Sequence, residues 1–266
     1  MSMSRQTGAV ALVVSVLVAG AAFGQIKGTI VRMNGTEAAG ELKWKVREKV
    51  YEVATGTVIV EVPVADVHEV KVPKPKALTD AEQLMRDGNV PAAIPALLKV
   101  STDYLMLNWD KPATRLLADA YLKDGKTDEA IKVCEAVIRS DPSAAYIGDF
   151  APIYWQALLK KGSISKVEDL MTRAIKSGDR IASASALIMR GDLIMATGDT
   201  NDNAKKALRD GYLRVVTLYA NEKAVLPEAL YKAAKSFEKI GQTPRADSFR
   251  TELKRDFPGT EWASKQ

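Results

Sequence analysis

The chain has 266 residues and a formal net charge of +5, with 47% hydrophobic and 27% charged residues. This balance is that of an ordinary globular protein and argues against disorder along the whole chain. A single cysteine and a single histidine exclude an internal disulfide and a zinc site built on several cysteines. Because charges of both signs are interspersed, we expect no nucleic-acid partner, and we also expect no metal, no cofactor and no catalytic residues.

Residues 1–24 have the pattern of a secretory signal peptide. Arg5 is the one charge in a short leader, and the uncharged run Gly8–Phe23 follows it. Ala22 and Gly24 place small residues at the −3 and −1 positions of a cut before Gln25. We therefore predict a periplasmic or secreted protein, without a lipid-modified cysteine at the cut. The alternative is an inner-membrane anchor formed by residues 8–23, although a spanning helix needs roughly 20 residues.

Residues 25–72 show the period-two alternation of β-strands. Leu42, Trp44 and Val46, for example, alternate with basic residues, which predicts a strand with one buried face. The same pattern predicts five strands, near residues 26–33, 40–47, 50–54, 57–62 and 68–72. Five strands in so short a segment indicate a small all-β domain, either a strongly bent sheet or, as we expect, a barrel-like one. Lysines and prolines in residues 73–77 predict a linker to the remainder of the chain.

Two features of this β domain could bind a ligand. A basic stripe could attract an acidic polymer such as a cell-wall glycan; it consists of Lys43, Lys45, Arg47 and Lys49. The simpler interpretation is that the stripe is the solvated face of one strand. His68 has no second histidine, cysteine or serine motif to accompany it, so a packed or surface role is the simpler interpretation there too.

Residues 78–266 change to a helical period and contain a repeat. Five glycines recur at spacings of 36 to 43 residues: Gly88, Gly125, Gly162, Gly198 and Gly241. Five residues after four of them stands a small or apolar residue, namely Ala93, Ala130, Val167 and Ala246. A glycine that ends one helix, followed by a small residue that lets the next helix approach closely, predicts a stack of helix pairs.

The repeated residues resemble the tetratricopeptide repeat family. Lys111–Ala144 matches the family pattern with Ala118, Tyr121, Gly125, Ala130 and Pro142, and Pro227–Thr260 matches it with Ala234, Phe237, Gly241, Ala246 and Pro258. Two segments depart from the pattern: Trp155 stands where the family has a small residue, and Asp199–Asn203 enlarges the fourth turn. The resemblance implies a mainly α superhelix of about five helix pairs whose concave face binds a protein or peptide.

The resemblance also implies where a partner binds. In the family, fixed positions of the first helix of each pair line the concave face. Carried onto this sequence, they are Arg115, Asp119, Lys123, Gln156, Lys160, Ile188, Asp192, Tyr231, Lys235 and Lys239. This set is polar with a cationic bias and one aromatic residue, which suits a peptide with acidic and apolar side chains.

The last repeat suggests a setting for this function. Its segments Leu226–Leu230 and Phe257–Thr260 look like the exported repeats of the Tol–Pal-associated protein and of the outer-membrane assembly lipoprotein. That likeness implies a non-enzymatic protein-interaction scaffold of the bacterial cell envelope. The alternative is a module that binds an envelope polymer through its β domain. The sequence sets neither the partner nor the oligomeric state.

Three short motifs have simpler explanations than catalysis. Gly125-Lys126-Thr127 resembles the end of a phosphate-binding loop, but alanine occupies position 120, where that loop needs glycine. Ser163 begins an S-x-x-K motif without its companion motifs, and we expect it to cap a helix. Cys134 falls at a core position of its repeat and is predicted to be buried.

Overall fold

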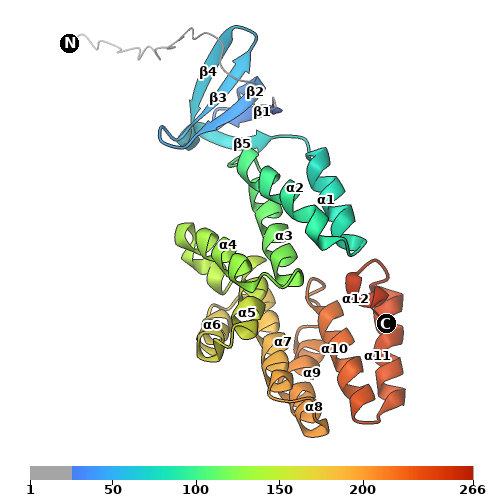
Figure 1. Ribbon diagram of the computed structural model, residues 1–266. Coiled ribbons are helices and arrows are strands. Elements are labelled where there is room, and N and C mark those ends of the chain that lie inside the picture. The colour runs from blue at the N-terminus through green and yellow to red at the C-terminus, as the bar shows by residue number, and fades with distance from the viewer. Residues whose placement is uncertain (1–25, 266) are drawn as a thin grey trace, which may run out of the picture. The chain divides into compact units, whose positions relative to one another are not determined.

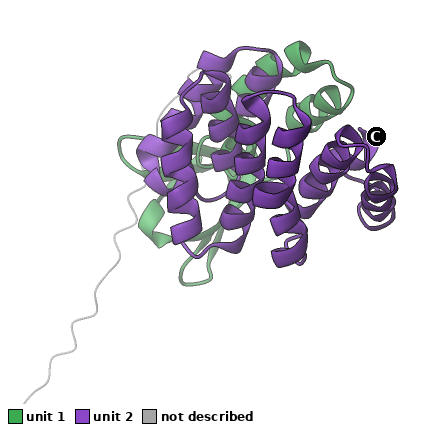
Figure 2. Ribbon diagram, turned by 90° about the horizontal axis from the view of Figure 1, so that it is seen from below, with its two compact units in different colours: residues 1–116 green, residues 117–266 purple. Residues whose placement is uncertain are grey.

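The computed structural model describes residues 26–265 (Figure 1). The predicted signal peptide, residues 1–24, lies outside the described residues. The chain divides by its internal contacts into two units, one ending at Leu116 and one beginning at Leu117 (Figure 2). The first unit contains a β-sheet, the first helix pair and the start of the next helix, and the second contains the remainder of that helix and those that follow.

The first unit opens with a five-stranded antiparallel sheet in the order β4-β3-β2-β1-β5. Its strands are β1 (Lys27–Arg32), β2 (Glu37–Lys45), β3 (Val50–Thr55), β4 (Val58–Pro63) and β5 (Val67–Lys71). A short 3₁₀ turn, η1 (Val64–Asp66), joins β4 to β5. The five predicted strands are confirmed, although β2 begins earlier than the alternation indicated.

The barrel-like closure that we expected is wrong, because β4 and β5 remain the two edges of an open sheet. The edge of β5 is taken by side chains instead of a strand. The side-chain amide of Asn108 donates to the carbonyl of Val70, and the indole nitrogen of Trp109 donates to the carbonyl of Val72 at 2.9 Å. These bonds occupy two of the carbonyl groups that a closing strand would need.

One face of the sheet supplies the core of the first unit. Its buried residues are Ile30, Leu42, Tyr51, Val53, Val62 and Val70, with Leu107 packed on them. The Tyr51 hydroxyl donates to the carbonyl of Met106 at 3.0 Å. Val46, which the alternation placed on the buried face, is 61% exposed because the strand ends at Lys45. The predicted linker, residues 73–77, thus lies within the first compact unit, while the domain limits stay predictions.

The remaining residues form helix pairs. The first pair is α1 (Lys76–Arg86) and α2 (Val90–Asp103), and α3 (Asp110–Lys123), which crosses the boundary between the units, pairs with α4 (Thr127–Ser140). The later pairs are α5 (Phe150–Lys160) with α6 (Ile164–Lys176), α7 (Arg180–Ala196) with α8 (Asn201–Ala207), and α10 (Leu226–Lys239) with α11 (Thr243–Asp256). A 3₁₀ turn, η2 (Pro142–Ala145), precedes α5, and a short helix, α12 (Glu261–Ser264), follows α11.

The predicted glycines do end the first helix of each pair. Four of them have φ between 75° and 77°, namely Gly88, Gly125, Gly162 and Gly241, and Gly198 has φ 153°. At the second pair the Lys126 amide returns to the Tyr121 carbonyl at 2.8 Å, which satisfies a carbonyl left over by the helix end. The small residues Ala93, Ala130, Val167 and Ala246 are fully buried, so the packing argument for the repeat is confirmed.

The fourth pair departs from the others. Its second helix continues beyond α8 through a π-helical turn, η3 (Leu208–Tyr212), into α9 (Leu213–Leu218). Gly211 packs against Gly191 of α7, and a Cβ atom at Gly211 would lie 2.8 Å from the Gly191 nitrogen. Ala207, the last residue of α8, is fully buried.

Candidate functional site

A groove in the second unit brings together part of the predicted concave face. Its volume is about 480 Å³. It is lined by Asp192, Met195, Asp199 and Tyr212, and by Tyr231, Lys232, Lys235, Ser236, Glu238 and Lys239 of α10. Four of the predicted residues are therefore neighbours here: Asp192, Tyr231, Lys235 and Lys239. We call this surface the α7–α10 groove.

The floor of the α7–α10 groove is an ion-pair network. Lys232 Nζ lies 2.6 Å from Asp192 Oδ2 and 2.6 Å from Glu228 Oε1, and the Tyr212 hydroxyl donates to Asp192 Oδ1 at 2.9 Å. Burial alone lowers the pKa of Lys232, but the two carboxylates more than offset that effect and its pKa is raised. Burial, together with the charge of Asp192, raises the pKa of Tyr212 as well. Both groups therefore stay protonated, and their donors are already engaged.

The rim of the groove holds one cation that is only loosely paired. Lys239 Nζ lies 2.8 Å from Asp199 Oδ2, and Glu238 accepts a hydrogen bond from Arg250 at 2.6 Å. Lys235 lies 3.9 Å from Glu238, and its side chain is 61% exposed. An exposed pair at that separation contributes little energy, so Lys235 is the cation best placed to meet an acidic group of a ligand.

Tyr231 supplies an aromatic surface whose position is set by the C-terminal helix α12. Its ring centre lies 5.4 Å from that of Trp262. Trp262 in turn lies beneath Lys265, whose Nζ is 4.0 Å from the ring centre. A ring packed in this way is already ordered, which lowers the entropic cost of binding.

Two predicted residues lie elsewhere. Ile188 of α7 is only 4% exposed and packs in the core of the second unit, so it lines no surface. The resemblance misplaced it because α7 is covered on several sides, by α6, by α8 and by η3. Arg115 is half-buried on α3 and belongs to the first unit.

The other predicted residues form a second polar cluster on α3 and α5. Lys123 Nζ pairs with Asp119 at 2.8 Å, and Lys160 Nζ donates to the carbonyl of Leu122 at 3.1 Å. Gln156 is half-buried on α5. The Lys160 bond links α5 to α3, and the Lys123–Asp119 pair lies within α3. The role of these four residues in binding stays a prediction.

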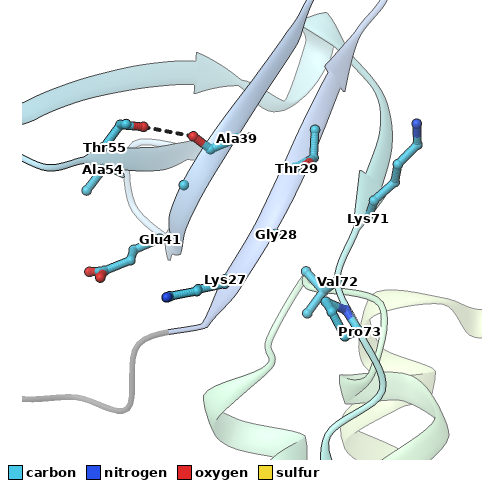
Figure 3. Close-up of a pocket in the computed structure, with 11 residues that line it drawn as sticks. Lys27, Gly28, Thr29, Ala39, Glu41, Ala54, Thr55, Lys71, Val72 and Pro73 are labelled. Carbon is cyan, nitrogen blue, oxygen red and sulfur yellow. Dashed lines mark hydrogen bonds between the residues drawn. The ribbon is translucent and has the colours of Figure 1, made fainter.

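A second hollow, of about 730 Å³, lies on the sheet of the first unit. Figure 3 shows its lining, which is Lys27, Gly28, Thr29, Ala39, Gly40, Glu41, Ala54, Thr55, Lys71, Val72 and Pro73. Gly28 and Gly40 face each other across β1 and β2. A Cβ atom at Gly28 would lie 2.7 Å from the carbonyl oxygen of Lys71, so glycine permits the close approach of β5. The Thr55 hydroxyl donates to the carbonyl of Ala39 at 2.8 Å (Figure 3).

The predicted basic stripe does not line this hollow. Lys45 Nζ is paired with Glu52 at 3.3 Å and with Glu61 at 2.9 Å, so part of the stripe is neutralised on the sheet itself. Lys49 lies in the turn after β2, with φ 54°. His68 is exposed on β5. The interpretation as a solvated face therefore fits the stripe.

The remaining motifs have structural roles. Cys134 is fully buried, and burial raises the pKa of its thiol to about 12, which leaves it unreactive near neutral pH. Ser163 precedes α6, but its side chain makes no capping hydrogen bond, so the expected cap is wrong.

Between residues 26 and 265, no three histidine, cysteine or acidic side chains are grouped closely enough to hold a metal ion. In the same range no helix is both long enough and apolar enough to cross a membrane.

Comparisons with known proteins agree with the helix pairs. Residues 116–144 and 228–260 match the tetratricopeptide repeat family. The chain is 28% identical over 132 residues to a pentatricopeptide repeat-containing protein of Arabidopsis thaliana, covering 48% of this chain and 12% of the plant protein. It thus spans only a small part of that relative's length.

Two solved structures, of a tetratricopeptide protein and of a pilus biogenesis factor, are also similar to this chain. A thermophilic tetratricopeptide protein of Thermus thermophilus is 17% identical, with a TM-score of 0.45, covering 71% of this chain and 96% of that one. PilW, a widely conserved type IV pilus biogenesis factor, is 14% identical, with a TM-score of 0.36 and the same two coverages. The helix pairs, their turn glycines and the two matched segments together identify a stack of tetratricopeptide-like helical repeats.

Proposed function

We propose that this protein is an exported, non-enzymatic scaffold of the bacterial cell envelope that binds a protein or peptide partner through the α7–α10 groove. The observation that carries the proposal is the convergence of Asp192, Tyr231, Lys235 and Lys239 on one groove. Stacked helical repeats use such surfaces to bind partner proteins. Export rests on the signal-peptide pattern of residues 1–24.

The chemistry of the groove favours a peptide with an acidic residue near an apolar one. Lys232 is held by two carboxylates, so the cation offered to a ligand is the exposed Lys235. The Tyr231 ring and the Met195 side chain line the same groove and give an apolar surface beside that charge. An aromatic residue beside a cation is typical of interface centres.

Affinity capture tests this proposal. The mature chain is used as bait in an envelope extract, and the captured proteins are compared with those of the double variant Tyr231→Ala, Lys235→Ala. We expect the variant to lose its partner by about tenfold or more, because both substituted residues lie in the groove. Lys206→Ala is the matched control, since Lys206 is exposed on α8 and does not line the groove.

Two outcomes of this capture decide the matter. If the double variant keeps its helical circular dichroism and loses the partner while Lys206→Ala retains it, the groove is the binding surface. Equal capture by the wild type and the double variant contradicts the proposal.

A second function, binding of an envelope glycan by the sheet, is favoured by the hollow between β1, β2 and β3. Figure 3 shows Lys27 and Glu41 on one side of it and Lys71 on the other, which gives polar groups for hydroxyl-rich ligands.

Two variants test this second function. Ala39→Trp would fill the hollow, whereas Ala65→Trp places the same side chain on η1, outside it. Co-sedimentation with insoluble cell wall should be lost only in the first variant, and retention by both would reject this function.

A further inference from the structure

The two edges of the open sheet differ in their hydrogen bonding. The edge of β5 is occupied by the side chains of Asn108 and Trp109. The backbone of β4, at the other edge, is bonded to β3, and within residues 26–265 no side chain or loop donates to it or accepts from it on its outer side. The sheet therefore has one sealed edge and one open edge.

The register of β4 fixes which of its groups point outward. In an antiparallel ladder, alternate residues bond to the neighbouring strand and the others point away from it. The Val64 amide donates to the Lys49 carbonyl at 3.0 Å, just beyond the end of β4. This pair continues the register in which Val60 lies opposite Val53, so every second residue back from Val64 also bonds to β3. Even-numbered residues thus bond inward, and Ile59 and Glu61 present their N–H and C=O groups at the open edge.

The sequence of β4 protects this edge with a single charge, that of Glu61, which is itself paired with Lys45 at 2.9 Å. Exposed edges are normally blunted by several charged residues, lysine above all, by an internal proline or by a bulge. β4 has no lysine, its register to β3 is regular, and its one proline, Pro63, is its last residue. Val58 is 48% exposed beside this edge. A regular edge rich in β-branched residues is a template for another strand.

We propose that β4 pairs antiparallel with β4 of a second copy of this chain, making one continuous sheet across a two-fold axis at Val60. In this register Ile59 lies opposite Glu61 of the second copy, and these two residues exchange both backbone hydrogen bonds. Val60 lies opposite Val60 of the second copy, and Val58 opposite Val62, so the valine row of one copy continues into that of the other. A register centred on Glu61 would instead oppose two carboxylates, which is unfavourable.

The sealed edge of β5 limits the assembly to two copies. Because Asn108 and Trp109 occupy the Val70 and Val72 carbonyls, addition of β4 to β5 of another molecule, which would generate an open fibre, is disfavoured. The contact is six residues long, which is smaller than a standard stable interface. The dimer is therefore weak, and its population depends on protein concentration.

Sedimentation equilibrium of the mature chain, from about 1 μM to about 1 mM, tests this proposal. Ile59→Pro removes one outward N–H and leaves the bonds to β3 intact. Pro63 is also an odd-numbered residue of β4, and it is accommodated there without loss of a bond to β3. We expect it to weaken dimerisation by about tenfold or more, while Ile59→Val, which keeps that N–H, dimerises like the wild type. A wild type that stays monomeric at the highest concentration, or an unchanged Ile59→Pro dimer, overturns the proposal.

A second pair of variants tests the register and remains informative if Ile59→Pro does not fold. Ile59→Glu places a carboxylate opposite Glu61 of the second copy and weakens the dimer, whereas Ile59→Lys places an ammonium there and keeps or strengthens it. Both substitutions place a charge at the same position of β4, and urea denaturation of each variant measures its separate effect on the free chain. Equal dissociation constants for the two variants overturn the two-fold at Val60.

Discussion

Lys232 and Lys235 lie one turn apart on α10, yet their surroundings differ. The Lys232 side chain is 18% exposed and contacts two carboxylates at 2.6 Å, whereas the Lys235 side chain is 61% exposed and contacts one carboxylate at 3.9 Å. Removing a buried ion-pair partner leaves charges without compensation, while removing an exposed one costs little. Lys232 thus contributes to the stability of the fold, whereas Lys235 contributes little to it and remains accessible at the surface.

We predict that Lys232→Met lowers the free energy of unfolding by about 3 kcal/mol, because Asp192 and Glu228 then lose their shared cation. Lys235→Met, the matched control on the same helix, should change it by less than about 0.5 kcal/mol. Urea denaturation followed by circular dichroism gives both values. Similar losses for the two variants would contradict the view that Lys232 holds the groove floor together.

Cys134 gives a prediction in pH. Burial holds the pKa of its thiol at about 12, above the usual value of 9.0 that it regains on unfolding. The native thiol therefore stays protonated between pH 9 and 12 while the unfolded one ionises, so the free energy of unfolding falls as pH rises through that range. We expect Cys134→Ala to reduce this slope and the native wild type to resist alkylation at pH 8. Rapid labelling of the folded protein would show that the thiol is accessible.

At the scale of elements, the helix pairs were predictable and the fourth pair only in part. The turn glycines at Gly88, Gly125, Gly162 and Gly241 carry a local signal, because a left-handed residue must follow each helix. The π-helical turn η3 carries no such signal, since it depends on the contact of Gly211 with Gly191 across two helices. That turn places Tyr212 against Asp192, so the floor of the groove could not be predicted from spacing.

We predict that Gly191→Ala destabilises the protein by about 2 to 3 kcal/mol, because the added methyl group would overlap the ring of Tyr212. Gly125→Ala is the control: its site is sterically open, and only the left-handed backbone, with φ 77°, opposes alanine, at about 1 kcal/mol. Thermal and urea unfolding of both variants checks the difference. An equal cost would mean that α7 and η3 separate without penalty.

Trp155 illustrates a departure that the sequence revealed but did not explain. The corresponding positions in the other pairs are small, as at Ala118 and Ala234, which are buried like Trp155 itself. The indole fits because its nitrogen donates to the carbonyl of Ala145 at 2.8 Å, in the 3₁₀ turn η2 that precedes α5. A family pattern marks such a residue as unusual, and only the packing of the intervening turn shows how it is accommodated.

For the whole molecule, local patterns predicted the kinds of element but wrongly suggested that the sheet closes. Alternation identified the five strands, but Asn108 and Trp109, which seal β5 and leave the sheet open, lie far from it in sequence. The site was predicted to a similar degree. Of the family positions, Asp192, Tyr231, Lys235 and Lys239 line one groove, whereas Ile188, which was expected on a surface, is buried. Helical spacing gives the face of a residue within its own helix, whereas burial depends on which helices cover that face.

The compartment of the whole molecule is the subject of the last prediction. We predict that the chain is exported and cut near Gln25, because the uncharged run Gly8–Phe23 ends in small residues at the −3 and −1 positions of that cut. Intact-mass measurement on protein from the envelope fraction should give a species that lacks residues 1–24. Ala22→Arg places a large charged side chain at the −3 position and should leave the chain uncut, whereas Ser4→Arg adds the same charge in the leader and should permit cleavage. A wild-type species that retains Met1 would contradict cleavage and favour the inner-membrane anchor.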